Sequence, residues 1–490
     1  MRLSEIRSEL ELVGGSNWHD VQLKSITADS REVQPGSLFV AVPGTRVSGV
    51  AFVEEAVRRG AAAVISPREV PLPSEVPGLW VSDGKWALSA AASRFSGHPS
   101  REMRVVGVTG TNGKTTTTYL LRSMLQAAGH RVGLIGTTGY FLDDKKQEAP
   151  VTTPDAIRTH ALLAAMTGEG ITHAVMETSS HALDQLRVRH VEFDVGIFTN
   201  LTGDHLDYHR DLAAYLDAKA SLFRQLSPRA TAVLNQEDLA SSYFMNVSRA
   251  RTFSYGFASG GHMSCRVLSA DMSGTDAVLR TPIGQIHCHS PLKGVFNLSN
   301  IMAAASGAIA LGLDADAIRS GIENLQAIPG RLESVDAGQP YPVIVDYAHT
   351  EDALRAVLTE LRHLVTGRLI VVFGCGGDRD RSKRPHMGRV VEKLADLAVV
   401  TSDNPRSEDP DLIIKEVLSG MLRPERARVV PDRREAFREA FREATPDDLV
   451  LLAGKGHENT QTSGDGCQPF DDREEARALL EEGGSLRVAS

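Results

Sequence analysis

The chain of 490 residues is too long for a single hydrophobic core, and its length suggests about three domains of about 150 residues each. Its formal net charge of −9 argues against nucleic-acid binding, which requires a concentrated basic surface. The four cysteines are scattered without the paired spacing of a metal site or a disulfide framework, which favours a reduced, cytoplasmic environment.

Residues 1–15 alternate charged with apolar side chains and lack the uninterrupted apolar core of a signal peptide. No later segment is apolar for long enough to predict a transmembrane helix. We therefore expect a soluble monomer that acts on small molecules, with no nucleic-acid partner and no membrane insertion.

The chain divides into three series of predicted elements. Residues 1–98 contain two short strand candidates, 37–42 and 61–66, among helical stretches, and predict a small α/β domain. In residues 99–330 apolar strands alternate with helices, which predicts a mostly parallel sheet covered on both faces. Residues 331–490 repeat this alternation and predict a second, Rossmann-like domain. The strands expected in the last two domains are 105–109, 132–136, 173–177, 194–200, 231–235, 342–349, 368–374, 397–404 and 448–456.

The segment 107–117, GVTGTNGKTTT, lies between an apolar strand and an amphipathic helix, which is the context of a phosphate-binding loop. Two glycines, Gly110 and Gly113, allow the backbone N–H groups to turn toward phosphates. Lys114 supplies a positive charge, and the hydroxyl of Thr115 suits Mg²⁺. The predicted nucleotide-binding residues are Gly110, Thr111, Asn112, Gly113, Lys114, Thr115 and Thr116.

The loop departs from the general P-loop, because Val108 stands at the first glycine position and the nearest glycine is Gly107. This G-x-T-G-T-N-G-K-T form resembles the ATP loop of the Mur ligases and of their relatives, the folylpolyglutamate synthetases. The resemblance extends over almost the full chain. It implies a UDP-sugar-binding domain at 1–98, an ATP-binding domain at 99–330 and an amino-acid-binding domain at 331–490.

Polar side chains follow two strands of the expected central sheet. Glu177 ends one strand, and Asp204 and His205 follow another. An isolated acidic residue or histidine is more often an ordinary polar group, but two polar strand ends after one phosphate loop favour a binding site. A carboxylate there suits the Mg²⁺ that bridges ATP phosphates. The resemblance implies that Glu177 and His205 help to hold Mg²⁺.

Lys219 lies in an expected helix, where a lysine is usually a solvated surface charge. The resemblance instead implies that Lys219 reacts with CO₂ and forms a carbamate, an anion able to bind a second Mg²⁺. It also places Arg331 near the γ-phosphate of ATP. The implied catalytic residues are Lys114, Lys219, His205 and Arg331.

Two downstream segments resemble the adenosine contacts of the family. Asn297 and Asn300 open an expected helix and correspond to adenine contacts, whereas Asp346 corresponds to a ribose contact. Taken alone, the two asparagines are equally typical of a helix cap, and Arg331 is equally typical of a linker.

Residues of the first and second expected domains resemble the family's site for a UDP-linked muramoyl dipeptide. They are Ala28, Ser30, Thr45, Arg46, Val47, Thr152, Thr153, Ser179, Gln185 and Arg187. Two positions depart from the pattern, since Arg46 stands where His or Gln is expected and Val151 stands where Asn can occur.

Three C-terminal segments resemble the branch of the family that adds the third amino acid to UDP-N-acetylmuramoyl-L-alanyl-D-glutamate. They provide Arg379, Asp403, Asn404, Pro405, Arg406, Gly454 and Glu458. The D-N-P-R segment implies meso-diaminopimelate as the incoming amino acid. The chemistry agrees, because the guanidinium of Arg406 suits a distal carboxylate and the carboxylate of Glu458 suits a distal ammonium. Without the resemblance, Asn-Pro-Arg is typical of an ordinary turn.

The resemblance implies amide-bond formation that depends on ATP and Mg²⁺. The D-glutamyl carboxylate attacks the γ-phosphate, and the amine of diaminopimelate then attacks the resulting acyl phosphate. Because an acyl phosphate hydrolyses readily, we expect the C-terminal domain to close over the central one. The alternatives are a folate- or cyanophycin-type amide ligase and a P-loop motor or switch.

Overall fold

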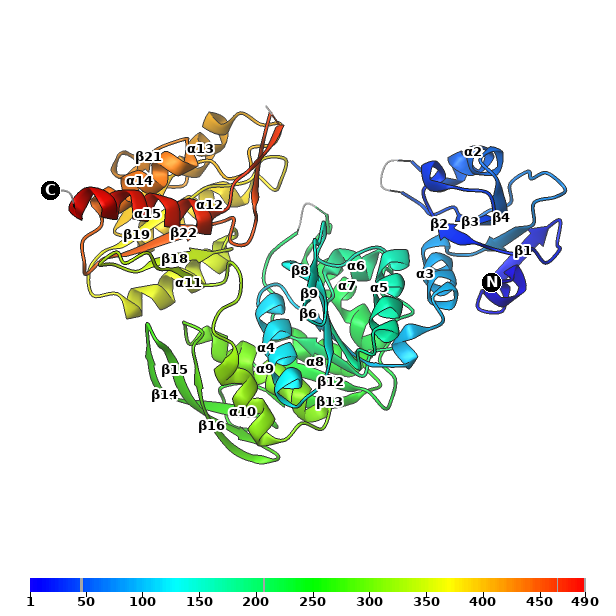
Figure 1. Ribbon diagram of the computed structural model, residues 1–490, viewed down its shortest axis with the longest axis horizontal. Coiled ribbons are helices and arrows are strands. Elements are labelled where there is room, and N and C mark those ends of the chain that lie inside the picture. Colours follow the sequence, from blue (N-terminus) through cyan, green and yellow to red (C-terminus); the bar gives the residue numbers. More distant parts are fainter. Residues whose placement is uncertain (45–46, 206–207, 465, 489–490) are drawn as a thin grey trace.

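The computed structural model describes the chain except residues 45–46, 206–207, 465 and 489–490. The described residues form three α/β parts that follow one another along the chain (Figure 1). The N-terminal part, in blue, meets the central part, in cyan and green, through the helix α3 (Gly84–Phe95). The C-terminal part, in yellow to red, lies on the other side of the central part. This arrangement agrees with the predicted α/β class.

The N-terminal part contains a five-stranded sheet. Its elements are α1 (Leu3–Arg7), β1 (Leu12–Ser16), β2 (Ser25–Thr27), η1 (Ser30–Glu32), β3 (Ser37–Val40), η2 (Gly49–Phe52), α2 (Val53–Arg58), β4 (Ala61–Ser66), β5 (Gly78–Val81), α3 and η3 (Pro99–Arg101). The strand order is β1-β5-β4-β3-β2, in which only β1 runs antiparallel to its neighbour. Successive residues of β3, Leu38 and Phe39, pack into cores on opposite faces of the sheet.

The central part contains an eight-stranded, mostly parallel sheet. Its strands are β6 (Arg104–Thr109), β7 (Val132–Gly136), β8 (Gly139–Leu142), β9 (Lys145–Gln147), β10 (His173–Glu177), β11 (Val195–Phe198), β12 (Thr231–Asn235) and β13 (Arg251–Tyr255). In the order β13-β12-β11-β6-β10-β7-β8-β9, only β8 and β9 are antiparallel. Val105 and Val106 pack into opposite cores, as expected for a sheet with helices on both faces.

Helices cover both faces of the central sheet. They are α4 (Lys114–Ala127), α5 (Ala156–Gly168), α6 (Ser180–Asp184), α7 (Leu212–Arg224), α8 (Ala240–Val247), α9 (Phe296–Ala310) and α10 (Ala315–Asn324). The parallel sheet and its helical cover confirm the fold class predicted for this region.

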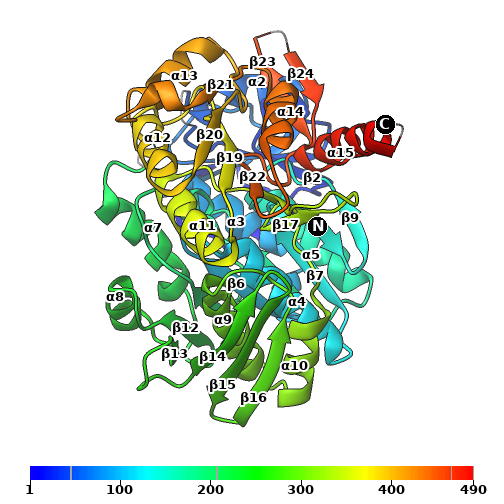
Figure 2. The same ribbon diagram turned by 90° about the vertical axis from the view of Figure 1, so that its left-hand side faces the viewer.

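A three-stranded antiparallel sheet lies outside the predicted elements. It consists of β14 (Ser264–Asp271), β15 (Gly274–Thr281) and β16 (Gly284–Ser290), and Figure 2 shows it below the C-terminal part. β14 leaves most of its residues exposed, including Val267 and Leu268, so it lacks the burial pattern of a core strand. The sheet packs on the central core through Ala277 and Leu279 of β15.

The C-terminal part contains a six-stranded sheet in the order β17-β18-β22-β19-β20-β21, with β17 antiparallel. Its strands are β17 (Glu333–Val335), β18 (Val343–Asp346), β19 (Leu369–Phe373), β20 (Leu397–Val400), β21 (Arg428–Val429) and β22 (Leu449–Ala453), followed by the hairpin β23 (Thr460–Ser463) and β24 (Gly466–Pro469). Its helices are α11 (Glu351–Leu364), α12 (Lys383–Leu394), α13 (Pro410–Leu418), η4 (Pro424–Arg426), α14 (Arg433–Glu443) and α15 (Asp472–Val488). The domain boundaries near residues 98 and 330 stay a prediction.

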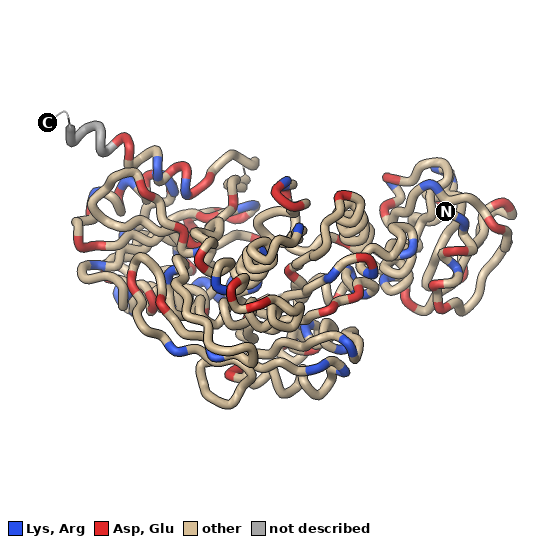
Figure 3. The backbone as a smooth tube through the Cα atoms, turned by 60° about the horizontal axis from the view of Figure 1, so that its bottom comes forward, with Lys and Arg blue, Asp and Glu red and all other residues tan. Residues whose placement is uncertain are grey.

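Acidic and basic residues are intermixed along the backbone of all three parts (Figure 3). Among the described residues, no helix combines the length and the apolar character that a membrane crossing requires.

One buried ion pair joins the last two helices of the C-terminal part. Arg433 of α14 and Asp472 of α15 are both fully buried, with Nη2 of Arg433 2.6 Å from Oδ2 of Asp472. The guanidinium also donates to the carbonyl oxygens of Ser402, at 3.3 Å, and Ala453, at 3.1 Å. Arg433 therefore links the segment that follows β20 to the carboxyl end of β22.

Replacing Asp472 by Ala should destabilise the protein by about 3–5 kcal/mol, because the Arg433 charge would stay buried without its partner. Chemical denaturation followed by circular dichroism measures this change. Glu475→Ala is the matched control, since Glu475 pairs with Arg434 across the same two helices at the surface. An exposed pair contributes about 0–1 kcal/mol. Equal losses in the two variants would contradict the importance of burial.

Candidate functional site

A cavity of about 550 Å³ lies between the central and C-terminal parts. On one side are the carboxyl ends of β6, β10 and β11. On the other are the linker that joins α10 to β17, residues 325–332, and the segment that follows β18. Ligands bind at such strand ends in open parallel sheets. The predicted residues that line it are Gly110, Thr111, Asn112, Gly113, Lys114, Thr115, Thr116, Thr152, Glu177, Ser179, His205, Lys219, Asn297, Asn300, Arg331 and Asp346. The structure thus gathers the residues assigned to ATP and metal in one cavity between two parts of the chain.

The phosphate loop needs its glycines for steric reasons. Gly110 and Gly113 have φ angles of +151° and +85°, which side chains rarely adopt. A Cβ atom on Gly113 would also overlap the side-chain oxygen of Asn300. α4 begins at Lys114, directly after the loop, so the N-terminal end of the helix dipole faces the cavity. This is the geometry of an anion site.

Lys114 lies folded back over the loop. Its Nζ donates hydrogen bonds to the carbonyl oxygens of Gly110, at 3.0 Å, and Thr111, at 2.8 Å. Burial lowers the pKa of Lys114, while the carboxylates of Glu177 and Asp204 oppose this change. Phosphate oxygens in the loop would offer the ammonium group stronger acceptors than these two carbonyls.

Glu177, at the end of β10, is buried and accepts three hydrogen bonds. Oε1 accepts from the hydroxyl of Thr115, at 3.0 Å, and from the backbone N–H of Thr137, at 2.9 Å. Oε2 accepts from the hydroxyl of Thr137, at 3.0 Å. Sequence reasoning missed Thr137, although it directly follows the strand β7. A hydroxyl and a carboxylate brought together at a phosphate loop are oxygen ligands of the kind that Mg²⁺ prefers, so these residues fit the predicted ion.

His205 also lines the cavity and has a left-handed backbone, with φ +56°. Its N–H donates to the carboxylate of Asp204 at 2.8 Å. Although 43% of its side chain is exposed, desolvation in the cavity wall lowers the pKa of the imidazole to about 4. The ring is therefore neutral at pH 7, which is the form that binds metals. In the part of the chain that the structure describes, no three His, Cys, Asp or Glu side chains cluster as a metal site.

Lys219 is buried in α7, with only 1% of its surface exposed, so the surface alternative is wrong. Its Nζ donates to the carbonyl oxygen of Gly110 at 2.8 Å and lies 4.3 Å from the ring centre of Tyr215. Burial, with a further contribution from the charge of Lys114, lowers the pKa of Lys219 well below its ordinary value. A neutral amine is the nucleophilic form that reaction with CO₂ requires.

The predicted adenine contacts bond to each other. Asn300 donates from Nδ2 to Oδ1 of Asn297 at 2.9 Å, and Asn297 donates to the carbonyl oxygen of Lys293 at 2.7 Å. Both side chains line the cavity, on the side where α9 begins. The Asn300 oxygen lies against Gly113, so Asn300 also supports the phosphate loop.

Asp346 fastens the linker between the central and C-terminal parts. Its two oxygens accept the backbone N–H groups of Leu332 and Ala348, each at 2.8 Å, and burial raises its pKa. The N–H of Tyr347 donates to the carbonyl oxygen of Gly330 at 2.9 Å. The predicted ribose ligand thus holds the linker as well as lining the cavity.

Arg331 extends from this linker into the cavity. Its Nη2 donates to the hydroxyl of Thr115 at 3.3 Å, and its guanidinium lies 4.7 Å from the ring centre of Tyr347. The neighbouring Gly330 has φ +65°, and any Cβ there would overlap the backbone of Gly456. The linker therefore contacts both the phosphate loop and the segment after β22.

Five residues assigned to the UDP-linked substrate form one chain of contacts in the central part. The hydroxyl of Thr153 donates to the carbonyl oxygen of Glu177 and accepts from the N–H of Ser179. Arg187 donates to the side chain of Gln185 and to the carbonyl oxygen of Thr153. The hydroxyl oxygens of Thr152 and Thr137 lie within hydrogen-bond distance, 3.1 Å apart.

Three further residues assigned to this substrate, Ala28, Ser30 and Val47, lie in the N-terminal part and do not line the cavity. Ser30 is buried and donates to Glu55 at 3.0 Å, and Val47 is 55% exposed. Ala28 belongs to the segment that follows β2. Thr45 and Arg46 lie outside the described residues.

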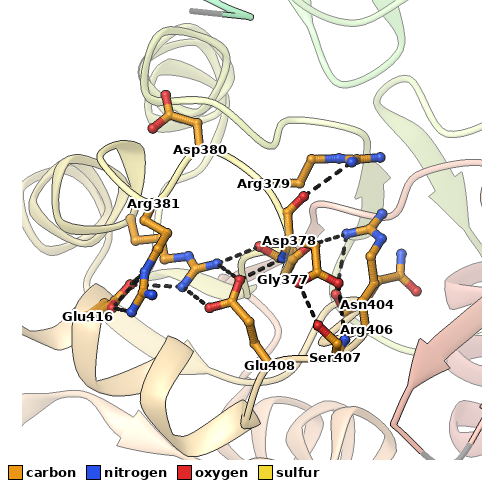
Figure 4. A network of polar contacts seen from close by, with 12 residues as sticks. Gly377, Asp378, Arg379, Asp380, Arg381, Asn404, Arg406, Ser407, Glu408 and Glu416 are labelled. Atoms are coloured by element: carbon orange, nitrogen blue, oxygen red, sulfur yellow. Dashed lines mark hydrogen bonds and ion pairs between the residues drawn. The ribbon is translucent and has the colours of Figure 1, made fainter. Parts of the chain in front are cut away.

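The residues assigned to diaminopimelate meet at the carboxyl ends of β19, β20 and β22. They lie on separate loops: Arg379 follows β19, Asp403, Asn404, Pro405 and Arg406 follow β20, and Gly454 and Glu458 follow β22. Figure 4 shows two of these loops joined by hydrogen bonds.

Arg406 belongs to the contact between two of these loops. Its Nη1 donates to the carbonyl oxygen of Gly377 at 2.7 Å, and its backbone is left-handed, with φ +54°. The buried Arg384, which was not predicted, also joins the two loops, because it binds Glu408 and the carbonyl oxygen of Gly376. One Arg406 nitrogen is therefore already bound within the protein.

Family models match three successive stretches of the chain. They describe the Mur ligase family catalytic domain at 22–96, the Mur ligase middle domain at 108–308 and the Mur ligase glutamate ligase domain at 330–456. Together these stretches cover most of the sequence.

Curated relatives share the full length of the chain. Proteins named UDP-N-acetylmuramoyl-L-alanyl-D-glutamate--2,6-diaminopimelate ligase are 43% identical in Geobacter metallireducens, over 98% of this chain and 99% of that protein, and 44% identical in Gloeobacter violaceus, over 98% of each. A solved structure of the same name has a TM-score of 0.67 and 32% identity, covering 94% of this chain and 95% of the other. A folylpolyglutamate synthase from Mycobacterium tuberculosis complexed with ADP, with a TM-score of 0.63 and 21% identity, covers 75% of this chain and 91% of its own and shares the fold.

Gly113→Ala should weaken ATP binding about tenfold or more, because the methyl group would displace Asn300 and the loop together. Isothermal titration with ATP measures the affinity. Gly129→Ala is the matched control at the other end of α4, since Gly129 has a similar φ of +82° but open space around its Cβ position. Equal affinities for ATP in the two variants would contradict the assignment of the loop.

Proposed function

The chain belongs to the Mur ligase family, and we propose that it joins meso-diaminopimelate to UDP-N-acetylmuramoyl-L-alanyl-D-glutamate while converting ATP to ADP and phosphate. This reaction belongs to cytoplasmic peptidoglycan precursor synthesis. The observation that carries the proposal is the 43% identity, over 98% of the chain, to a relative of that name. The arginine-containing loops at the ends of β19 and β20 support it, because diaminopimelate carries a distal carboxylate that lysine lacks.

The first step forms an acyl phosphate. A D-glutamyl carboxylate oxygen attacks the γ-phosphorus of ATP, the bond to the β–γ bridging oxygen breaks, and ADP leaves with that electron pair. Lys114 belongs to the phosphate loop itself, whereas Arg331 reaches the hydroxyl of Thr115 from the linker. Their positive charges neutralise the negative charge that develops on the transferred phosphoryl group.

Thr115, Glu177 and His205 are the residues that we propose to hold Mg²⁺. The bound ion supplies charge neutralisation at the ATP phosphates. We further propose that Lys219 is carbamylated, since its amine is buried beside the phosphate loop and burial lowers its pKa, which favours the reactive neutral form. The carbamate would place an anion suited to a second Mg²⁺ close to Lys114.

The second step forms the amide. The amine of diaminopimelate attacks the acyl carbonyl, the tetrahedral intermediate collapses, and phosphate leaves while the nitrogen loses its proton. Positioning is the main contribution of the protein, because both reactants must meet in one orientation. The amino-acid loops belong to the C-terminal part and the phosphate loop to the central part, so the parts must close together to exclude water from the acyl phosphate.

We propose a division of labour among the three parts. Residues 1–98 bind the uridine nucleotide, residues 99–330 bind ATP and the muramoyl dipeptide, and residues 331–490 bind diaminopimelate. Asn297, Asn300 and Asp346 then contact the adenosine of ATP, since they line the same cavity as the phosphate loop.

The runner-up is a folate-type amide ligase, which shares the ATP chemistry. It is disfavoured because the solved folylpolyglutamate synthase covers only 75% of this chain, whereas the solved structure named as a diaminopimelate ligase covers 94%.

The decisive experiment offers the wild-type protein ATP, the UDP-dipeptide and equal amounts of meso-diaminopimelate, L-lysine and L-ornithine, with products identified by mass spectrometry. We expect the diaminopimelate product to dominate and ADP to form only when all substrates are present. Preferential ligation of another amino acid, or of a folate, would refute the proposed function.

Arg406→Ala should reduce kcat/KM for diaminopimelate on the order of 30-fold, which corresponds to a loss of about 2 kcal/mol of transition-state stabilisation. The reason is that the distal carboxylate would lose its guanidinium partner. The poor reaction with lysine should change much less. The measured quantity is the ratio of the two kcat/KM values. Arg381→Ala controls for a nearby exposed arginine that pairs with Glu416. Equal losses for both substrates would mean that Arg406 acts only by bonding to Gly377.

Lys219→Ala should be nearly inactive and should recover part of its activity with added formate or acetate, which replace the carboxylate of the carbamate. Steady-state rates with and without these anions test the effect. Lys114→Ala is the control, because it keeps the carbamate on Lys219 and its activity should not be rescued by the anions. The carbamate would be contradicted by two results together: wild-type protein in bicarbonate buffer whose mass shows no addition of CO₂, and a Lys219→Ala variant whose activity the anions do not restore.

A further inference from the structure

A second fully buried lysine lies next to the predicted amino-acid site. Lys455 follows β22 and is 0% exposed. Its Nζ donates to the carbonyl oxygen of Thr460 at 2.5 Å and lies 3.4 Å from both Oδ1 of Asn404 and Oε2 of Glu458. A buried ammonium group is costly unless its partners are well placed. These contacts satisfy all three of its hydrogens.

The contacts of Asn404 change the interpretation of the D-N-P-R segment. Oδ1 of Asn404 accepts from the N–H of Thr462, at 2.9 Å, as well as from Lys455. Its Nδ2 donates to Oε2 of Glu458 at 2.7 Å. The Asn404 amide is thus engaged with neighbouring protein groups, one of which is the Glu458 carboxylate.

Both hydrogen bonds that the structure describes on the Glu458 carboxylate fall on Oε2. Two donors, the Asn404 amide and the Lys455 ammonium, therefore fix one oxygen of the group. Oε1 is left for a ligand, and 32% of the Glu458 side chain is exposed. A carboxylate held in this way is suited to receive a substrate ammonium group.

We propose that Lys455 is a positioning residue of the amino-acid site, whose buried ammonium, together with Asn404, orients the Glu458 carboxylate toward the distal ammonium of the incoming diamino acid. This inference rests on the proposed function, because it takes Glu458 as a ligand of that substrate. Lys455 touches no substrate itself and acts through Glu458.

The charges around Glu458 show why such a cation is needed. Burial raises the pKa of Glu458, the nearby Asp403 carboxylate raises it further, and Lys455 and Asn404 lower it. A site with two neighbouring carboxylates would favour a protonated Glu458 if Lys455 were absent. A protonated carboxyl group binds an ammonium group poorly.

Two other groups face Glu458 from elements packed against it. Arg433 of α14 interacts electrostatically with Glu458 and Asp403, and Tyr347, after β18, interacts with both carboxylates. Arg433 is already paired with Asp472, and the raised pKa of Tyr347 keeps its phenol neutral. Among the residues that the structure describes, Lys455 is therefore the cation in direct contact with the Glu458 carboxylate.

The test compares Lys455→Met with wild-type protein over a range of pH. We expect kcat/KM for diaminopimelate to fall about tenfold or more, with the KM values for ATP and the UDP-dipeptide within about twofold. The acidic limb of the kcat/KM profile for diaminopimelate should move to higher pH by about one unit, since Glu458 loses the charge that keeps it ionised. Lys415→Met, at an exposed position of α13, controls for loss of a lysine and should leave both quantities unchanged.

A purely structural role for Lys455, through its bond to Thr460, would lower activity without moving the acidic limb, and that result would overturn the inference. Lys455→Gln keeps a hydrogen-bond donor without the charge. If Lys455→Met fails to fold, Lys455→Gln replaces it in the test. The acidic limb of the kcat/KM profile of Lys455→Gln should also move to higher pH.

A double-mutant cycle gives a second measure. In a Glu458→Gln background, Lys455→Met should add little to the loss of kcat/KM for diaminopimelate, because the carboxylate that Lys455 orients is already absent. Multiplicative losses would show that the two residues act independently and would overturn the inference.

The two proposals fail in different ways. If wild-type protein ligated L-lysine or L-ornithine instead of diaminopimelate, the proposed function would fall. The same comparisons would then be made with that amino acid, whose side-chain ammonium would take the place at Glu458. If wild-type protein used diaminopimelate and the acidic limb of Lys455→Met and Lys455→Gln stayed in place, only the role of Lys455 would fall.

Discussion

The carboxylate of Asp346 holds the arrangement on which the site depends. It ends β18, and its two oxygens bind the N–H groups of Leu332 and Ala348, so the linker cannot move independently of the C-terminal sheet. This attachment carries Arg331 to the hydroxyl of Thr115 in the central part. The cavity is therefore made of two sheets whose carboxyl ends face each other, and neither part contains a complete site.

Inside the cavity, the main electrostatic constraint is the crowding of cations around one backbone oxygen. Lys114 and Lys219 both donate to the carbonyl of Gly110, and burial lowers the pKa of each. Two ammonium groups this close repel each other strongly where water is excluded. The arrangement favours the neutral form at Lys219, whose pKa is lowered well below its ordinary value, and this is the form that carbamylation requires.

Local signals in the sequence were sufficient for the phosphate loop and for the parallel strands, because glycine spacing and strand–helix alternation are short-range patterns. The burial of Lys219 was not accessible in this way, since it depends on the packing of α7 against a loop more than a hundred residues earlier. Thr137 was missed for the same reason: its role comes from Glu177, on a neighbouring strand. The strand β14 was missed because it buries little apolar surface. Asn404 was assigned to the amino-acid site, and only the three-dimensional structure reveals its hydrogen bond to Glu458.

The contact between Gly330 and Gly456 has a mechanical consequence. No side chain fits at Gly330, because its Cα packs directly on the backbone that leads to His457 and Glu458. The linker thus packs on the loop that we assign to the incoming amino acid. Asp346 also fastens the linker to the C-terminal sheet, so Arg331 and this loop belong to one packed unit. A displacement of the loop on amino-acid binding would be passed through this contact to Arg331, and from Arg331 to Thr115.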